Sequence, residues 1–589
     1  MTMHLSRRKR HILLLGTVPG LLFCLSSGSS GQVSGAAPLT NFGAATCAAL
    51  AAQPLSGVPV VGLHIKSSKW HEGGLTIPSR EGQSAPLPAH CEVEGNYGEH
   101  RGADGSTYRT GFRMRLPQDW NGRFLFQGGG GSNGVVGDAI GPNGPGNRPA
   151  IMRGYAVIAQ DSGHDNSVNF DPAKGGELVF GRDPRARADY GHASLNRSYK
   201  VGLFLIRAAY GRAPTTKLFW GCSKGGQEGM AFAQRYPTAF DGIVAMAPGF
   251  ALPRAAIAQA WDVQQFASIL KADGIVPSGA GLKTAIRADQ MKIVTATVAK
   301  VCDADDGVVD GIIGAIGKCT SARVMPELRK RQCSSLGQTD CLQASQIDAL
   351  GRVIGGPRSS SGKALYSAWP WDLGLAEPGW RAWKLGLADG PIARNIALGG
   401  GSLAAVFMAP PTELPNDPER ILAWQLAFDF DRDPPRIYQI SEPYTTSPWI
   451  DVGMRSTDLS AFKAHGGKMI VPHGMSDPVF SAYDTIDWWR ALNNRNHGQA
   501  ANFVRVFPVP GMNHCGGGQA TDRFDSLGAL EDWVLNQRAP DAIPASAGPM
   551  TPWPGRKRPL CAYPTIAMRG PGDSFTCSAA LRPSYTAKR

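Results

Sequence analysis

The segment WGCSKGGQEGMAFAQRYP, residues 220–237, decides the fold because it contains the pattern G-x-S-x-G around Ser223. The residues TKLFW before the pattern are apolar and typical of a short buried strand, and the residues after it predict a helix that ends before Pro237. A further apolar run, FDGIVAMAP at residues 240–248, predicts the next buried strand. A strand, a sharp turn with an exposed serine and a helix form a nucleophile elbow. We therefore expect an α/β fold with Ser223 as the nucleophile.

The same pattern occurs again in the glycine-rich segment GGGGSNG, residues 128–134, after the apolar run RFLFQ. No helix-forming sequence follows Ser132, so this match does not predict a second elbow. A glycine-rich loop at the end of a strand brings backbone N–H groups close to a ligand, because no Cβ intervenes. We expect Gly131 and the backbone N–H of Lys224 to form an oxyanion hole.

A serine nucleophile needs a base and an orienting acid, and two later loops offer both. Asp477 and His514 each follow a predicted strand at its carboxyl end, where α/β sheets place their sites. The chain order Ser223, Asp477, His514 is that of the α/β-hydrolases, which predicts that fold and acyl transfer. Asp484 and Asp487 are rivals for the role of the acid.

The N-terminus has the form of an export signal. Residues 7–10 are all basic, residues 12–25 are mostly apolar, and a run of small residues follows. This apolar stretch is too short to span a bilayer comfortably. Phe23 stands where a small residue precedes a lipidated cysteine, so we do not expect anchoring through Cys24. We predict a signal peptide and linker over residues 1–37 and a secreted or periplasmic protein without a membrane span.

The cysteine count agrees with export. Of the 11 cysteines, all except Cys24 lie beyond the signal, and an even number in an exported chain predicts disulfides. The candidates are Cys47, Cys91, Cys222, Cys302, Cys319, Cys333, Cys341, Cys515, Cys561 and Cys577. The sequence does not fix their pairing, although Cys302–Cys319 and Cys333–Cys341 are natural neighbours.

Two of these cysteines flank the expected catalytic residues. Cys222 precedes Ser223, and Cys515 follows His514. If serine and histidine lie within hydrogen-bond reach, their neighbours can fall within disulfide distance. A bond there would clamp the nucleophile to the base.

Charge and composition exclude one class of partner. The formal net charge is +13, but the basic residues are scattered and do not form a stripe with aromatic residues, so nucleic-acid binding is not expected. A hydrophobic content of 42% is ordinary for a soluble globular protein. We expect a monomer that acts on a small aromatic ester.

A long insertion interrupts the predicted sheet. Between the strand at 240–248 and Asp477 lie about 220 residues, far more than one crossover needs. Such an insertion commonly forms a lid over a hydrolase site. We expect a hydrolase core over residues 38–250 and 458–589, with a lid domain over 251–457 between its two parts. The second part would end in a disulfide-stapled tail.

Within the expected lid, the segment CDADDGVVDGII places Asp303, Asp306 and Asp310 in one tight loop. Carboxylates this close repel one another unless a cation neutralises them, and all-oxygen ligation indicates a hard ion such as calcium. Glycines let the loop curl, so that the carbonyls of Val308 and Ile312 also point inward. A solvated acidic turn is the alternative. Because the loop is far from the triad in sequence, we expect such an ion to have a structural role.

Several motifs together resemble the tannase and feruloyl esterase family of secreted α/β-hydrolases. They are the Cys-Ser and His-Cys pairs of the triad, DSGHD, YGRAPTTKLFWGCSKGGQEGM, YPTAFDGIVAMAPG, HGMSDPVFSA and VPGMNHCGGG, and they extend through nearly all of the mature chain. The resemblance implies a serine esterase with calcium on the acidic loop. It implies no organic cofactor.

Within the family, WNGRFLFQGGGGSNG, RSTDLSAFKAHGGKMI and ATDRFD are most similar to a hydrolase of a terephthalate half-ester. Arg394 is a natural partner for a carboxylate, because a guanidinium binds one bidentately, although a solvated surface arginine is the alternative. The similarity implies the carboxylate role. It also implies a pocket lined by Trp383, Ser402, Phe407 and Phe480. The similarity also implies that Leu398 lines the pocket. Leu398 and Gly399 stand where that enzyme has an aromatic residue and a serine, so the pocket shape differs there. Lys224 stands where that enzyme has an acid, but its expected oxyanion role uses the backbone N–H.

Three functions remain open. The first, which we expect, is hydrolysis of a carboxylate-bearing aromatic half-ester such as mono(2-hydroxyethyl) terephthalate. The second is feruloyl esterase or tannase activity on plant phenolic esters, which Leu398 keeps open. The third is a non-catalytic binding protein on the same fold, against which the complete triad argues.

Overall fold

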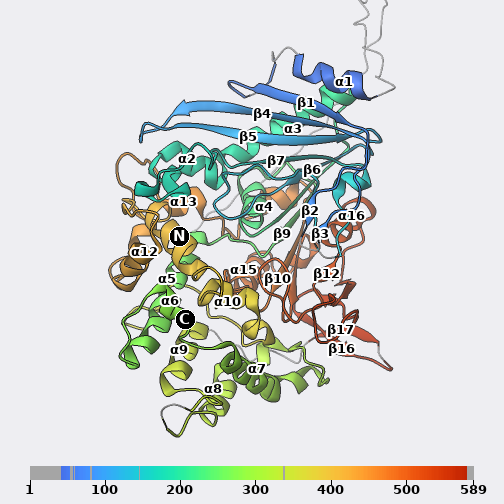
Figure 1. Cartoon of the computed structure of the whole chain (residues 1–589). Coiled ribbons are helices and arrows are strands. Elements are labelled where there is room, and N and C mark those ends of the chain that lie inside the picture. Colours follow the sequence, from blue (N-terminus) through green and yellow to red (C-terminus); the bar gives the residue numbers. More distant parts are fainter. Residues whose placement is uncertain are drawn as a thin grey trace, which may run out of the picture. The chain divides into compact units, whose positions relative to one another are not determined.

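The computed structural model describes residues 42–579, apart from residues 53–56, 59, 80–81, 145, 336–337 and 573. The expected signal peptide and linker, residues 1–37 with Cys24, lie outside the described residues. The centre of the fold is a nine-stranded sheet in the order β1-β4-β5-β7-β6-β8-β9-β10-β11 (Figure 1).

Six neighbouring strands of this sheet are parallel to one another, and three antiparallel strands extend it. The parallel strands are β6 (Arg123–Gln127), β7 (Ala156–Gln160), β8 (Thr216–Cys222), β9 (Gly242–Met246), β10 (Lys468–Gly474) and β11 (Val504–Val509). The antiparallel strands are β1 (His64–His71), β4 (His90–Arg101) and β5 (Thr107–Pro117). The mostly parallel sheet is of the α/β-hydrolase type, and every strand expected around the three candidate catalytic positions is present.

The central strands are covered on both faces, and their alternate residues point into two different cores. On β8, Phe219 joins the core that contains α3 (Ser194–Tyr210) and α4 (Lys224–Arg235). Its neighbour Leu218 packs in the core that contains α16 (Ser526–Asn536). The two-residue period of a strand dictates this alternation, so a strand with helices on both faces is apolar along its whole length.

The chain between β9 and β10, which we call the inserted segment (residues 251–457), forms helices. Its longest helix, α5 (Leu252–Ala272), packs against α9 (Ala344–Gly355). The others are α6 (Gly279–Leu282), α7 (Ala288–Cys302), α8 (Ser321–Arg329), α10 (Pro378–Lys384), α11 (Gly401–Ala405), α12 (Pro418–Leu426) and α13 (Pro448–Val452). The described residues cluster as one compact unit, and the inserted segment shares its hydrophobic core with the sheet.

The remaining elements are short or lie near the ends of the described chain. The helices are α1 (Ala44–Ala49), α2 (Pro184–Ala188), α14 (Ser460–Ala464) and α15 (Ala482–Arg495). The strand pairs are β2 (Pro78–Ser79) with β3 (Gly82–Gln83), β12 (Arg523–Phe524) with β14 (Ala545–Ser546), β13 (Ala542–Ile543) with β15 (Leu560–Cys561), and β16 (Thr565–Arg569) with β17 (Phe575–Ala579). A disulfide between Cys561 and Cys577 fastens the last hairpin.

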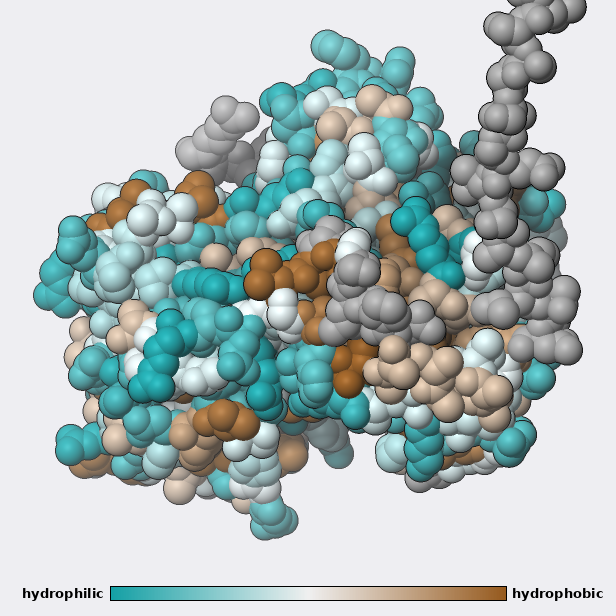
Figure 2. All heavy atoms as spheres, turned by 90° about the horizontal axis from the view of Figure 1, so that it is seen from above, coloured by the Kyte–Doolittle hydropathy of each residue, from teal (hydrophilic) through white to brown (hydrophobic). Residues whose placement is uncertain are grey.

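In the part of the chain that the structure describes, no helix is long and apolar enough to cross a bilayer. Polar side chains cover most of the face shown in Figure 2, and hydrophobic ones lie in small groups between them.

The turn that carries Ser223 has the strained backbone of a nucleophile elbow. Ser223 has φ +66° and ψ −121°, a conformation that L-residues rarely adopt, between the end of β8 and the first residue of α4. A Cβ on Gly221 would lie 2.6 Å from the backbone of Gly225, and a Cβ on Gly225 would lie 2.7 Å from the carbonyl oxygen of Gly129. Both positions therefore require glycine, which gives the G-x-S-x-G pattern a steric cause.

Replacing Gly225 by alanine should lower Tm by about 5 °C, because the new Cβ overlaps fixed backbone at a cost of ~1–3 kcal/mol. The matched control is Gly355→Ala, since nothing lies within 4 Å of a Cβ built there. Differential scanning calorimetry on the two variants checks this. Equal Tm values would contradict the steric role of Gly225.

Candidate active site

Three side chains from three loops form a continuous hydrogen-bonded chain. Nε2 of His514 lies 2.7 Å from Oγ of Ser223, and Nδ1 of His514 lies 2.7 Å from Oδ2 of Asp477. Ser223 follows β8, Asp477 follows β10 and His514 follows β11, so all three lie at the carboxyl edge of the parallel strands. The structure thus brings the predicted triad together. In this geometry the imidazole can take the serine proton while the carboxylate holds the ring in orientation.

Asp477 is buried, and its surroundings favour the ionised carboxylate. Its Oδ1 accepts hydrogen bonds from the backbone N–H groups of Val479 at 2.7 Å and Phe480 at 3.1 Å. Nε2 of His473 lies 3.3 Å from Oδ2. Burial by itself raises the pKa of Asp477, but the charge of His514 and hydrogen bonds from both histidines outweigh it and hold the pKa well below its usual range. Sequence reasoning missed His473, which lies on β10 four residues before the acid.

The two rivals for the acid are engaged elsewhere. Asp484 forms an ion pair with Arg455 at 2.8 Å, and Asp487 lies 3.4 Å from Arg490. Asp477 is therefore the carboxylate that is hydrogen-bonded to the imidazole of His514.

Five disulfides join the ten cysteines expected beyond the signal. They are Cys47–Cys91, Cys222–Cys515, Cys302–Cys319, Cys333–Cys341 and Cys561–Cys577. The Cys222–Cys515 bond spans 293 residues, with Cα atoms 6.1 Å apart. It ties the turn of the nucleophile to the loop of the base.

The glycine-rich loop is fastened to α4 by Glu228, a residue that sequence reasoning missed. Oε2 of this buried carboxylate accepts the N–H of Gly129 at 2.9 Å, and Oε1 accepts Nδ2 of Asn133 and Nζ of Lys224, both at 3.0 Å. The spacing of four residues between Lys224 and Glu228 could have indicated this contact from the sequence, because it places the two side chains on one face of a helix. Gly131 and Lys224 line the same pocket, and the N–H of Lys224 lacks an intrahelical acceptor because it begins α4.

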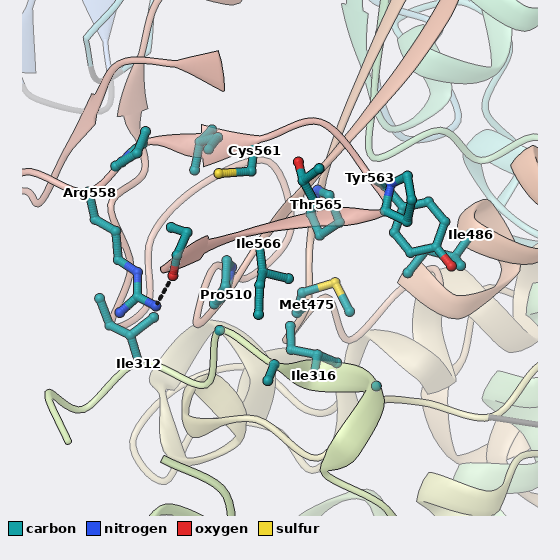
Figure 3. Close-up of a pocket in the computed structure, with 18 of the residues that line it drawn as sticks. Ile312, Ile316, Met475, Ile486, Pro510, Arg558, Cys561, Tyr563, Thr565 and Ile566 are labelled. Atoms are coloured by element: carbon teal, nitrogen blue, oxygen red, sulfur yellow. Dashed lines mark hydrogen bonds between the residues drawn. The ribbon is translucent and has the colours of Figure 1, made fainter. Parts of the chain in front are cut away.

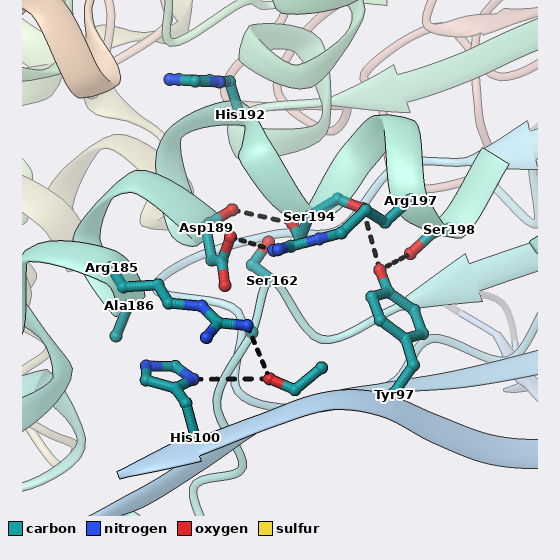
Figure 4. A network of polar contacts seen from close by, with 12 residues as sticks. Tyr97, His100, Ser162, Arg185, Ala186, Asp189, His192, Ser194, Arg197 and Ser198 are labelled. Carbon is teal, nitrogen blue, oxygen red and sulfur yellow. Dashed lines mark hydrogen bonds and ion pairs between the residues drawn. The ribbon is translucent and has the colours of Figure 1, made fainter. Parts of the chain in front are cut away.

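Tyr190 supports this loop from behind. Its hydroxyl donates to the carbonyl oxygen of Gly131 at 3.3 Å. The short helix that carries Tyr190, Asp189–Ala193, is held by the polar network in Figure 4. There the hydroxyl of Ser194 donates to the carbonyl of Asp189 at 2.7 Å, and the hydroxyl of Tyr97 on β4 donates to the carbonyl of Ser194 at 2.9 Å. The antiparallel extension of the sheet thereby helps to position the glycine-rich loop.

Ser223 and His514 open into a cavity of about 530 Å³. All six predicted substrate-binding residues line it, namely Trp383, Arg394, Leu398, Ser402, Phe407 and Phe480. The rings of Trp383 and Phe480 meet the imidazole edge-on, with centroids 6.0 and 5.4 Å away. The guanidinium carbon of Arg394 lies 5.6 Å from the centre of the Trp383 ring. The cavity thus combines an aromatic wall beside the base with the guanidinium of Arg394.

Asp372 in the inserted segment connects the loop of the acid with the loop of the base. Its buried Oδ2 accepts the hydroxyl of Ser476 at 3.0 Å and the N–H of Gly511 at 2.6 Å. Ser476 precedes Asp477, and Gly511 lies in the turn that leads to His514. Burial raises the pKa of Asp372 to about 6, although the hydrogen bonds that it accepts lower it. No local pattern marks this aspartate in the sequence, so sequence reasoning missed it.

Asp372→Asn should destabilise the protein in a pH-dependent way. Because the pKa of about 6 in the folded state exceeds that of a free carboxyl, the contribution of Asp372 to stability is complete below about pH 4 and is lost as pH rises through 6. The variant lacks this titration. Its deficit in Tm relative to wild type should therefore be larger at pH 4.5 than at pH 7.5.

Thermal unfolding at the two pH values measures this difference. Asp119→Asn, at an exposed position, is the charge-matched control. A deficit for Asp372→Asn that is the same at both pH values would contradict the titration assigned to this carboxyl.

A positively charged side chain that sequence reasoning missed lies against the acidic loop. Arg558, from the C-terminal segment, pairs with Asp306 at 2.5 Å and with Asp310 at 2.8 Å, and Figure 3 shows it beside Ile312. Asp303 accepts the backbone N–H of Asp310 at 3.3 Å. Burial raises the pKa of Asp306 even though Arg558 beside it lowers it. Arg558 therefore does not fully offset the effect of burial on Asp306, and Arg556 lies 3.9 Å from the carboxylate of Asp310.

A second pocket lies between this loop and the C-terminal segment. Its lining is mainly apolar and includes Ile316, Met475, Pro510 and Ile566 (Figure 3). Its volume is about 90 Å³, and Ser223 is not among its lining residues. We assign no chemistry to it.

A further group of possible metal ligands lies on β1 and β4. The ligand atoms of His71, His90 and Glu92 lie within 4.8 Å of one another. Arg115, however, lies 2.7 Å from Nε2 of His90 and also pairs with Glu92. We assign no chemistry to this group.

Comparison with known proteins covers most of the chain. A family model described as tannase and feruloyl esterase matches residues 91–580. The chain is 41% identical over 543 residues to mono(2-hydroxyethyl) terephthalate hydrolase of Piscinibacter sakaiensis, an alignment that covers 87% of this chain and 88% of that protein. It is 27% identical over 487 residues to a probable feruloyl esterase of Arthroderma benhamiae, covering 79% and 81% of the two chains. Feruloyl esterase B from Aspergillus oryzae has the same fold, with a TM-score of 0.68 and 22% identity over 91% of this chain and 99% of that one.

Proposed function

The chain belongs to the tannase and feruloyl esterase family, and we propose that it is a secreted or periplasmic serine esterase that hydrolyses an aromatic carboxylic ester. The observation that carries the proposal is the hydrogen-bonded chain of Ser223, His514 and Asp477 at the mouth of an aromatic cavity. The substrate that we assign is a carboxylate-bearing half-ester such as mono(2-hydroxyethyl) terephthalate. The five disulfides support an oxidising compartment.

In acylation, Oγ of Ser223 attacks the ester carbonyl while Nε2 of His514 takes its proton. Asp477 keeps the other ring nitrogen of His514 as its hydrogen-bond donor and stabilises the imidazolium that forms. His514 then gives the proton to the leaving alcohol. In deacylation the same histidine activates a water molecule, which releases the aromatic acid and restores Ser223.

The negative charge that develops on the carbonyl oxygen needs donors that are already in place. We assign this role to the backbone N–H groups of Gly131 and Lys224. Glu228 and Tyr190, which hold the glycine-rich loop and its carbonyl, support this assignment because they fix the loop before substrate arrives. The side chain of Lys224 is engaged by Glu228, so its identity does not alter the backbone donor.

The lining of the cavity supports an aromatic acyl group. Trp383 and Phe480 flank the imidazole, and an aryl ring attached to the scissile carbonyl would pack against them. Arg394 lines the same cavity, and a guanidinium suits a carboxylate at the far end of that ring. The name of the relative that is 41% identical points to the same half-ester.

The test is hydrolysis of mono(2-hydroxyethyl) terephthalate beside methyl ferulate and methyl gallate. Wild type should prefer the half-ester. Arg394→Ala should lower kcat/KM for the half-ester by about 10- to 100-fold, mainly through KM, because it removes a charge-assisted contact. The control is Arg420→Ala, at an exposed position.

Other outcomes decide between the alternatives. A preference for ferulate or gallate would assign feruloyl esterase or tannase activity instead. Failure of a fluorophosphonate probe to label Ser223, with no hydrolysis of any ester, would favour a binding protein.

We further propose that the acidic loop binds a structural calcium ion. Asp303, Asp306 and Asp310 offer carboxylate oxygens, and Val308 and Ile312 offer backbone carbonyls, which is the all-oxygen donor set that calcium prefers. The raised pKa of Asp306 supports this, because Arg558 alone does not offset the burial of the acid. When bound, the ion would supply charge neutralisation to the loop and take no part in ester cleavage.

Removal of calcium should lower the thermal stability of the protein. We expect EDTA to lower Tm by at least several degrees and added calcium to restore the Tm. An ion that binds only the folded state stabilises that state by mass action. Magnesium should restore it poorly, because it demands a tighter octahedral geometry. A Tm that is unchanged by EDTA, with no calcium found by mass spectrometry of the purified protein, would contradict the site.

A further inference from the structure

Gln259 is a buried polar side chain that faces the cavity and that the proposed mechanism does not use. It lies on α5, is 5% exposed, and lines the same cavity as Ser223 and Arg394. Its amide forms no hydrogen bond with any residue that the structure describes. Because Gln259 lines the cavity and its amide has no protein partner among the described residues, this group is available to a ligand.

The neighbouring glutamines on the same helix show that this is unusual. Nε2 of Gln264 donates to the carbonyls of Gln425 and Phe428, both at 2.8 Å. Oε1 of Gln265 accepts a hydrogen bond from Arg352 at 2.5 Å. Gln259 is the one of these three glutamines that lines the cavity.

Gly399 makes room for Gln259. A Cβ built on Gly399 would lie 2.2 Å from Oε1 of Gln259 and 3.0 Å from its amide carbon. A side chain at position 399 would displace the amide from this position, so the glycine leaves the space that the amide of Gln259 occupies. Gly399 belongs to the helical turn Asn395–Gly400, and Arg394 is the residue that caps the start of this turn. The same short element therefore carries the arginine and the space for the glutamine.

Arg394 is likewise free to meet a ligand. Within the described residues it makes no ion pair, and its guanidinium lies over the ring of Trp383. A carboxylate has two oxygens and accepts several hydrogen bonds, so a guanidinium and an amide N–H can share it.

We propose that Gln259 is a specificity-determining residue that donates through its amide to the distal carboxylate of the substrate, together with Arg394. Gly399 is small because the amide needs that space. The inference rests on the proposed function for the identity of the substrate. It adds a second contact to the distal carboxylate of the substrate and gives a reason for the glycine at position 399.

The experiment compares mono(2-hydroxyethyl) terephthalate with 2-hydroxyethyl benzoate, which lacks only the distal carboxylate. The readout is the ratio of the two kcat/KM values. Gln259→Leu should lower this ratio on the order of tenfold, because a charge-assisted hydrogen bond is lost. Gln259→Glu should lower it further, because it places a like charge against the carboxylate. Gly399→Ala should lower it as well, although it leaves the glutamine intact.

Two controls keep the result interpretable. Gln118→Glu makes the same chemical change at an exposed position and should leave the ratio at the wild-type value. Binding of terephthalate and benzoate to Ser223→Ala protein, measured by calorimetry, reports on the carboxylate contact without turnover. Terephthalate should bind more tightly than benzoate, and the added substitution Gln259→Glu should abolish that preference.

The outcomes separate the two proposals. If wild type hydrolyses neither ester but terephthalate binding depends on Gln259, the proposed activity is wrong and the carboxylate contact stands. If both esters are hydrolysed and neither Gln259 variant changes the ratio by more than twofold, the inference about Gln259 is overturned and the esterase stands. Equal binding of terephthalate and benzoate would also overturn the inference.

Discussion

A hydrogen bond of 2.7 Å between Ser223 and His514 joins positions 291 residues apart, and much of the structure serves to keep that contact in place. The elbow holds the serine in a strained conformation. The Cys222–Cys515 disulfide bonds the two neighbouring residues covalently. Because a proton can move between the two side chains only at hydrogen-bond distance, each of these constraints bears directly on the chemistry.

The inserted segment contributes to this geometry from the inside. Asp372 accepts hydrogen bonds from both loops that carry the acid and the base, while Trp383 lies against the imidazole. Arg394 and Gln259 add the polar groups at the cavity wall. The segment is therefore part of the catalytic framework as well as of the substrate pocket.

Five of the six parallel strands, the elbow and the order of the triad were predictable from the sequence, because buried strands and glycine turns leave local patterns, whereas β7 was not predicted. The family expected from the motifs is confirmed, with a match over residues 91–580. The strand β5 was not predicted, although its residues alternate between buried and less buried positions as a half-covered strand should. No local sequence pattern indicated the contacts of Asp372 and Arg558. Each is a single charged side chain that meets its partners across more than 100 residues of chain.

On the export route that we propose, the disulfide at the active site also constrains how the chain reaches its folded state. Cys222 emerges from the translocation channel long before Cys515, and Cys302, Cys319, Cys333 and Cys341 appear in between. These four pair locally in the finished protein, so the thiol beside the nucleophile must either stay reduced until the end of synthesis or be released from wrong partners by exchange. On this route, correct pairing of Cys222 therefore requires either its delayed oxidation or disulfide isomerisation in the receiving compartment.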